Sequence, residues 1–156
     1  MTPTRTAFGF AGWVVLPYVA AVLGALYSGP EFYSELRRPG WSPPAWLFGP
    51  VWTVLYGMMG VAAGVVWVRH KVRGAGPALG LFLVQLLLNA IWSPLFFGLR
   101  RPDLALIDIV ALWALIGATV VAFWRKRPVA GALLVPYWLW VSFATALNFE
   151  IWRLNG

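Results

Sequence analysis

Indole, phenol and amide side chains recur in this sequence at helical spacing, whereas the groups of acid–base and thiol chemistry are scarce. Two stretches place such residues at intervals of three and four, which puts each set on one helix face. The first set is Gln85, Asn89, Trp92 and Phe96. The second set is Tyr137, Trp140, Ala144 and Asn148. Flat aromatic walls with one or two amides predict a pocket for a planar, largely apolar ligand.

Other kinds of site find little support in the composition. Zero cysteines exclude disulfides, thiolate metal sites and cysteine nucleophiles. The single histidine, His70, falls in a loop on the side opposite the predicted pocket, so we expect no metal site and no histidine ligand for haem iron. The carboxylates Asp103, Asp108 and Glu150 lack a base or metal partner that would define a reaction. We therefore assign no catalytic residue from these groups.

The elements that must position the stripes are membrane-spanning helices. Of 156 residues, 61% are hydrophobic and 11% are charged, which is too apolar for a soluble domain. A helix needs ~20 apolar residues to cross the bilayer. Five stretches meet this length, at approximately 8–27, 45–68, 78–99, 104–124 and 129–152. Short loops make sequential helices antiparallel neighbours, so we predict an all-α membrane protein, a compact bundle of five transmembrane helices forming one domain over residues 1–156.

The boundaries and contact faces of these helices also carry signals. Prolines follow polar or basic loops at positions where they can open a helix. These are Pro44, Pro77, Pro102 and Pro128. Small residues at four-residue spacing mark faces of close helix approach, for which we favour packing within the bundle over a dimer seam. They are Gly60 with Gly64, and Ala114 with Ala118 and Ala122.

The net charge of +7 is distributed as a topology signal. Basic residues cluster between the spans and form no continuous face, so we predict the lipid bilayer as a partner and no nucleic acid. Counting by side gives seven Lys or Arg on the side of the N-terminus against five on the other. This small bias favours a cytoplasmic N-terminus. We call the side that carries the first loop, residues 28–44, the mouth side.

Depth decides whether the stripes can meet in one pocket. At a rise of ~1.5 Å per residue from the mouth-side helix ends, the depths are ~12 Å for Trp52, ~15 Å for Asn89, ~18 Å for Trp140 and ~12 Å for Ala144. The residues therefore share a layer in the mouth-side half. Alternatively, Asn89 bonds a neighbouring helix and the deep tryptophans serve packing. Nearer the interface, an anchoring belt is the better interpretation for Trp41, Trp46 and Trp152.

The first loop is unusually stiff and aromatic, with the run RRPGWSPPAW at 37–46. Prolines reduce the conformational freedom of the free loop, so it can hold a fixed shape over the bundle, and we interpret it as a lid. The preceding PEFYSELRRPG predicts one or two amphipathic turns with Phe32, Tyr33 and Leu36 facing inward. Arg37 and Arg38 either offer positive charge to a ligand carboxylate or face water and headgroups.

Several motifs in order resemble one family. They are WSPPAW at 41–46, PVWTVLYGMMG at 50–60, QLLLNAIWSPLFF at 85–97, ALIDIVALW at 105–113 and VPYWLWVSFATALNFEIWRLN at 135–155. On these motifs, which extend over nearly the whole chain, the sequence resembles the TspO/translocator protein family. Its members are also called tryptophan-rich sensory proteins or peripheral-type benzodiazepine receptors.

The resemblance implies a five-helix membrane protein, often a homodimer, that needs no cofactor and binds porphyrins such as protoporphyrin IX. It also implies cholesterol binding in animals, and isoquinoline-carboxamide and benzodiazepine-type ligands under the first loop. The implied binding positions are Tyr33, Pro43, Trp52, Asn89, Trp140 and Ala144. We add Trp92 and Asn148 from the two stripes. Phe149 stands where the sterol motif of animal members has tyrosine, which favours a bacterial-type member in a bacterial cell membrane, with a tetrapyrrole ligand.

Three functions follow from this reading. We rank first a binding protein for tetrapyrroles with a stress or sensory role. The second is a light-dependent porphyrin-degrading enzyme, in which the indoles of Trp52 and Trp140 would be the reactants. The third is a porphyrin or sterol transporter, which five spans without an internal repeat or an intramembrane charge relay support little.

Overall fold

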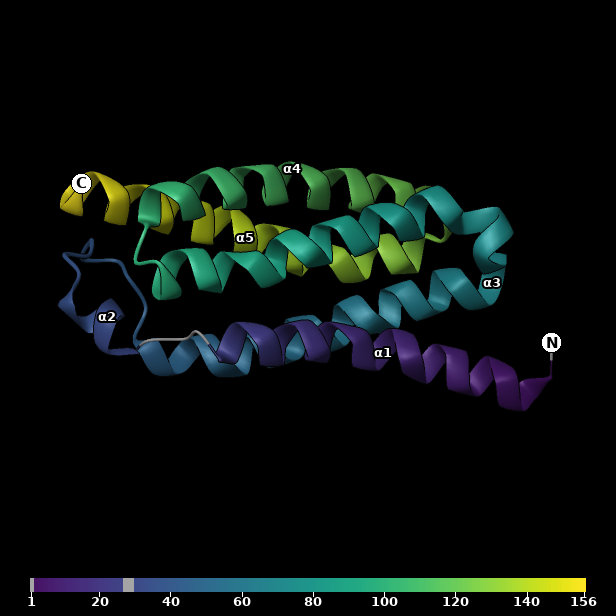
Figure 1. The fold of residues 1–156 in the computed structure, drawn as a ribbon. Helices are drawn as coiled ribbons and strands as arrows, with labels where there is room; N and C mark the ends of the chain where they lie inside the picture. Colours follow the sequence, from purple (N-terminus) through teal and green to yellow (C-terminus); the bar gives the residue numbers. More distant parts are fainter. Residues whose placement is uncertain (1, 27–29) are drawn as a thin grey trace.

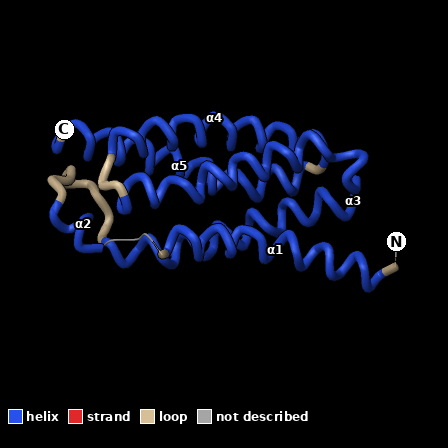
Figure 2. The backbone as a smooth tube through the Cα atoms, in the orientation of Figure 1, coloured by secondary structure: helices blue, strands red, loops and turns tan. Residues whose placement is uncertain are grey.

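Five membrane-spanning helices lie side by side in the computed structural model, which describes residues 2–26 and 30–156 (Figure 1). The elements in chain order are α1 (Pro3–Ala25), α2 (Pro30–Glu35), α3 (Ala45–Ser93), the π-helical turn η1 (Pro94–Gly98), α4 (Pro102–Lys126) and α5 (Pro128–Asn155). All regular structure in the described residues is helical, as Figure 2 shows. The predicted all-α bundle of five spans is therefore confirmed. Residues 27–29, where we expected the first span to end and the first loop to begin, lie outside the described residues.

The prediction of a loop between the second and third spans is wrong, because the single helix α3 contains both spans. A straight helix of 49 residues would be ~74 Å long, more than twice the hydrocarbon thickness, and Figure 1 shows α3 reversing its direction instead. The reversal occurs between the spans Ala45–His70 and Gly74–Gly98. Pro77 consequently lies inside α3 and does not open a new helix. The backbone hydrogen bonds of a helix thus replace the expected loop.

The other helix starts follow the proline signals. Pro102 and Pro128 each occupy the first turn of their helix, and Pro44 is the cap residue of α3. The helix α1 begins five residues earlier than predicted because Thr2 caps it, its Oγ1 accepting a hydrogen bond from the Arg5 N–H (3.2 Å). Apolar runs alone did not predict this start, because residues 4–6 are polar.

The glycines of α3 allow α1 to approach closely. A Cβ on Gly60 would lie 2.6 Å from the Cα of Val14, and one on Gly64 would lie 2.7 Å from the ring of Phe10. Because backbone atoms stand in the way at Gly60, a larger residue there would push α1 away from α3. This pair therefore serves packing within the bundle, as predicted.

The core runs along the inner faces of α3, α4 and α5. Met59, Phe82, Ile116, Phe123 and Leu134 are at most 1% exposed there. The rings of Phe82 and Phe123 stack with centroids 5.9 Å apart and join the second half of α3 to α4. These contacts fix the rotation of each helix and thereby the direction of the polar and aromatic stripes.

The mouth side gathers segments that are far apart in the sequence. Figure 1 shows α2 and the first loop beside the C-terminal end of α5, at the end of the bundle opposite the N-terminus. As predicted, Phe32 and Tyr33 point inward while Glu31 and Glu35 are exposed. The ring of Phe32 contacts Phe96 edge to face at 5.8 Å. The α2 helix therefore docks on the η1 turn by its apolar face.

Candidate functional site

An aromatic layer lies beneath the first loop. We use this name for Phe48, Trp52, Trp140 and Phe143. The indoles of Trp52 and Trp140 meet edge to face with centroids 6.5 Å apart, and Trp140 also contacts Phe48 (6.0 Å) and Phe143 (5.4 Å). Phe48 and Trp52 are four residues apart and so share a face of α3, while Trp140 and Phe143 share a face of α5. The depth argument that put Trp52 and Trp140 in one layer is confirmed.

A polar network forms the floor of this layer. It consists of Tyr56, Gln85, Asn89 and Tyr137, all buried. Tyr56 Oη donates to Asn89 Oδ1 (2.6 Å), Asn89 Nδ2 donates to Tyr137 Oη (2.8 Å), and Tyr137 Oη donates to Gln85 Oε1 (2.7 Å). The Trp52 ring stacks on Tyr56 at 5.3 Å, so layer and network are in direct contact. Both ends of the Asn89 amide are thus occupied by phenols, one of which, Tyr137, belongs to the neighbouring helix α5.

The indole N–H of Trp140, in the layer, is buried without a hydrogen-bond partner in the described part of the chain. Gln85 Nε2 and Asp108 Oδ2 share this condition among the described residues. A buried donor without an acceptor costs free energy, and native structures keep few of them. The Trp140 N–H can therefore gain a bond only if the surrounding side chains move and admit an acceptor.

The first loop closes over the layer from the mouth side. Tyr33 is 5% exposed, its hydroxyl donates to the Pro43 carbonyl (3.0 Å), and its ring meets Phe48 edge to face at 5.5 Å. The Arg38 guanidinium carbon lies 4.4 Å from the centroid of the Tyr33 ring. Tyr33 thus joins α2, the proline segment of the loop and the aromatic layer.

Trp92 and Asn148 occupy a different place. Trp92 Nε1 donates to Asn148 Oδ1 (3.0 Å), and Asn148 Nδ2 donates to the Pro102 carbonyl (3.0 Å). The Trp92 ring stacks on Phe96 at 4.8 Å. The polar atoms of this pair link three helices near the start of α4, so their direct use by a ligand would require these bonds to open.

The sequence predicted two of the four residues of the layer, Trp52 and Trp140, and missed Phe48 and Phe143. Phe48 lies four residues before Trp52, and Phe143 lies three residues after Trp140, so both positions carried the helical spacing used for their neighbours. Ala144 is half-buried and packs against the main core near Trp140. The assignment of ligand contacts to Tyr33, Pro43, Trp52, Asn89, Trp92, Trp140, Ala144 and Asn148 stays a prediction.

His70 and the exposed pair of Arg101 and Asp103 belong to neither the layer nor the network. His70 Nε2 donates to the Lys126 carbonyl (2.9 Å) at the end of the bundle opposite the mouth. Within the described residues, no three His, Asp or Glu side chains gather as metal ligands. On the mouth side Asp103 accepts two bonds from Arg101 (2.9 and 2.7 Å), and this carboxylate raises the pKa of the Arg101 guanidinium above its ordinary value.

Comparisons with known proteins agree with the motifs. A family model described as TspO/MBR family matches residues 9–153. Over 153 residues the chain is 44% identical to the Tryptophan-rich protein TspO of Chlorobaculum tepidum, covering 96% of this chain and 89% of the relative. It is 42% identical over 135 residues to the Tryptophan-rich sensory protein of Cereibacter sphaeroides, covering 86% and 84%. It is 38% identical over 149 residues to the Translocator protein of Homo sapiens, covering 92% and 88%.

Proposed function

Because this chain belongs to the TspO/MBR family, we propose that it binds a tetrapyrrole of the protoporphyrin IX type, or a similar planar apolar molecule, in the aromatic layer beneath the first loop. The chain is a multi-pass membrane protein, so such a ligand would reach it from the bilayer or from the mouth side. We further propose a bacterial cell membrane as its location and a stress or sensory role for the bound state.

The buried indole N–H of Trp140 is the observation that carries this proposal. It has no partner in the described structure, and the ring that carries it meets Trp52 edge to face at 6.5 Å. A tetrapyrrole offers both a π-surface for the indoles and acceptor atoms on its carboxylates and ring nitrogens. The carboxylates would come close to Arg37 and Arg38, which are exposed at the rim, and guanidinium–carboxylate pairs are strong hydrogen bonds.

Binding must separate rings that touch in this structure. Centroid distances of 5.3 to 6.5 Å around Trp52 correspond to direct ring contact. Because the two indoles are nearly perpendicular (87°), a flat ligand that enters between Trp52 and Trp140 replaces their mutual contact by stacking on one indole and meeting the other edge to face. The side chain of Ala144, one turn after Trp140, is small, so it hinders this movement less than a larger residue would.

Quenching of tryptophan fluorescence by protoporphyrin IX tests the proposal. We expect saturable quenching in lipid nanodiscs, and Trp140→Ala should weaken binding by about 1 to 3 kcal/mol. Trp113→Ala is the matched control, because Trp113 is 40% exposed and its N–H is bound to Ser142 Oγ (2.7 Å). Uptake no greater than that of empty nanodiscs, or equal losses in both variants, would remove the ligand hypothesis.

A light-dependent reaction is the second candidate, supported by the direct contact of the two indoles. An excited porphyrin between Trp52 and Trp140 would have two easily oxidised rings within contact distance. Trp52→Phe with Trp140→Phe keeps flat apolar walls, so porphyrin binding should largely survive while the light-driven loss of its absorption band slows. If the double variant bleaches as fast as the wild type, the light reaction is ordinary photosensitised decay and the protein is a pigment receptor or store.

A homodimer is a further proposal, taken from the family resemblance. The face of Gly60 and Gly64 is covered by α1, so the dimer contact would use another lipid-facing surface. Analytical ultracentrifugation in detergent should give twice the chain mass, and Gly60→Ala should disturb the α1–α3 packing without abolishing the dimer. Loss of the dimer in this variant at unchanged stability would place the contact on that glycine face after all.

A further inference from the structure

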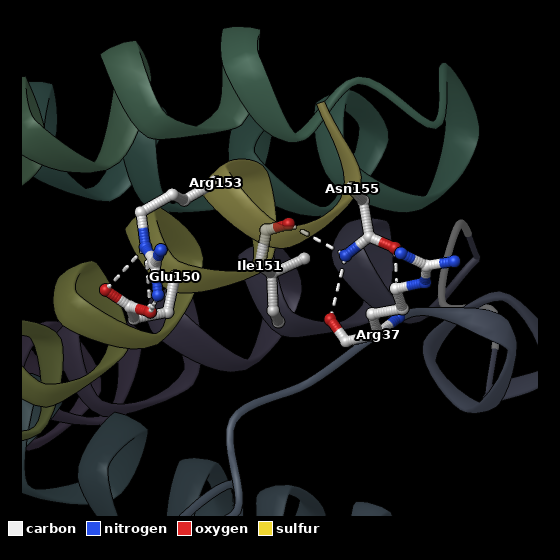
Figure 3. A network of polar contacts seen from close by, with 5 residues as sticks. All are labelled: Arg37, Glu150, Ile151, Arg153 and Asn155. Atoms are coloured by element: carbon white, nitrogen blue, oxygen red, sulfur yellow. Dashed lines mark hydrogen bonds and ion pairs between the residues drawn. The ribbon is translucent and has the colours of Figure 1, made fainter.

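The C-terminal end of α5 holds the first loop by a paired set of hydrogen bonds (Figure 3). The Arg37 N–H donates to Asn155 Oδ1 (2.9 Å), and Asn155 Nδ2 donates to the Arg37 carbonyl (2.8 Å). The same Nδ2 also donates to the Ile151 carbonyl in the last turn of α5 (2.8 Å). The Asn155 amide thus satisfies both backbone groups of one loop residue that is 118 positions away in the chain.

The tied segment leads directly to the aromatic layer. Trp41, four residues after Arg37, meets Phe143 edge to face with centroids 5.6 Å apart, and Phe143 contacts Trp140 at 5.4 Å. The position of the Arg37 backbone therefore determines where Trp41 rests on the rim. The proline segment that follows Trp41 returns to the bundle at the start of α3.

The other ties of this region include the hydrogen bond from the Tyr33 hydroxyl to the Pro43 carbonyl (3.0 Å), aromatic contacts and one ion pair. Phe32 and Tyr33 anchor α2 by aromatic contacts, and the ion pair between Arg100 and Glu35 is long (3.9 Å) and exposed, so it contributes little. The bonds of Asn155 are also exposed to solvent. Water can replace such bonds at small net cost, so this contact can open and close while α2 stays docked.

We propose that Asn155 is a positioning residue for ligand binding, whose amide latches the loop backbone at Arg37 and holds Trp41 on the rim, so that ligand exchange requires this latch to open. The proposal rests on the proposed function of the aromatic layer. It predicts that removing the latch changes how fast a ligand enters and leaves, with a smaller change in the affinity itself. A neutral amide suits this role because it pairs a donor and an acceptor at once without attracting a counter-ion.

Asn155→Ala is the test variant and Arg153→Ala the control. Arg153 lies on the same turn of α5 and donates to Glu150 (2.6 to 3.3 Å), so its replacement also removes hydrogen bonds at this helix end but no contact with the loop (Figure 3). Because the chain has no cysteine, spin labels can be placed on Gly40→Cys and Ala146→Cys alone. Gly40 has open space around it and Ala146 is exposed on α5.

Electron–electron distances between the two labels in nanodiscs report on the latch without any ligand. We expect one narrow distribution in the wild type and in Arg153→Ala, and a broad one in Asn155→Ala. Stopped-flow quenching with protoporphyrin IX should then show both association and dissociation rates raised about tenfold in Asn155→Ala, the scale of two lost hydrogen bonds.

Each outcome bears on a separate claim. An unchanged distance distribution in Asn155→Ala overturns the latch, and a broadened one with unchanged protoporphyrin rates overturns its role in ligand exchange. A lower unfolding temperature with normal rates would mean that Asn155 serves stability alone. If protoporphyrin IX does not bind even to the wild type, the proposed function fails, and the label distances still decide whether the latch exists.

Discussion

The aromatic layer and the polar network beneath it lie on the same helices, one turn apart, yet they are built on opposite plans. In the network, Asn89 has a partner at each end of its amide and Tyr137 both accepts and donates, while Gln85 Nε2 is the one network atom without a partner in the described structure. In the layer, the rings touch one another and the Trp140 N–H has no partner in the described structure. Ring contacts can be exchanged for contacts with another flat molecule, whereas a satisfied buried hydrogen bond can be broken only at a loss.

This difference assigns the two regions different tasks. The network joins both halves of α3 to α5 and so fixes the distance between the walls. The layer supplies walls whose contacts are not directional and can be remade. We therefore expect substitutions in the network to change stability first, and substitutions in the layer or its cover to change binding first.

The largest effect is expected for Tyr137→Phe. It leaves both Asn89 Nδ2 and Gln85 Oε1 without their partner in a side-chain environment that is 0% exposed, so the free energy of unfolding should fall by about 2 to 3 kcal/mol. Reversible unfolding in mixed micelles measures it. Tyr18→Phe is the control, since its hydroxyl donates to the Thr53 carbonyl outside the network (2.8 Å). Equal losses in the two variants would contradict a special role for the network.

Tyr56→Phe should have about half that effect. Tyr56 donates one bond, to Asn89 Oδ1, and Asn89 keeps its second bond to Tyr137, so we expect a loss of about 1 to 1.5 kcal/mol in the same assay. The double variant with Tyr137→Phe should lose less than the sum of the two, because both single changes act on one amide. Strict additivity would show that the bonds are independent.

Replacing Pro43 and Pro44 with Gly tests the cover of the layer. The carbonyl that accepts from Tyr33 is retained at position 43, but the free loop gains conformations, so affinity for protoporphyrin IX should fall by about 1 kcal/mol. Thermal stability of the ligand-free protein should change little. Gly40→Ala in the same loop is the control. Normal affinity with earlier unfolding would mean that the proline segment is a structural clamp.

The smallest effect, and one of opposite sign, is expected for Trp140→Phe. The substitution removes a buried N–H without a partner in the described structure and keeps an aromatic ring, so stability should stay the same or rise by about 0.5 kcal/mol. Affinity for protoporphyrin IX should decrease only slightly, because one donor to the ligand is lost while the aromatic wall is kept. A clear loss of stability would show that the layer is constrained as strictly as the network.

Helical periodicity predicted several of the residues that form the layer and the network. The spacing of Asn89 and Tyr137 indicated inward faces, and both side chains are buried. The depth of Trp52 and Trp140 followed from counting residues along helices, because the rise per residue is nearly constant. Interfacial anchoring was predicted for Trp41, which is 49% exposed at the rim.

The remaining features depend on distances that no local pattern sets. The pairing of Tyr56 with Asn89 depends on the relative rotation of two helix segments, since the residues are 33 positions apart. The bond between Arg37 and Asn155 depends on how the first loop and the end of α5 are aligned, since these residues are 118 positions apart. The reversal between the second and third spans was predicted, but its helical backbone was missed because Gly74, Gly76 and Pro77 are the residues of an ordinary loop. In this chain, they lie instead in a stretch that keeps its helical hydrogen bonds.

The continuous turn of α3 has a consequence for how the bundle moves. At the end opposite the mouth, both halves of α3 share one helical backbone, and α4 and α5 are joined through Arg127 alone. At the mouth, the helices are linked by the first loop and by residues 99–101. We therefore expect backbone amides to exchange with deuterium most slowly near the α3 reversal and progressively faster toward the mouth. The helices would then separate most at the mouth and least at the opposite end, and the amplitude of this motion would increase with the length of the helices.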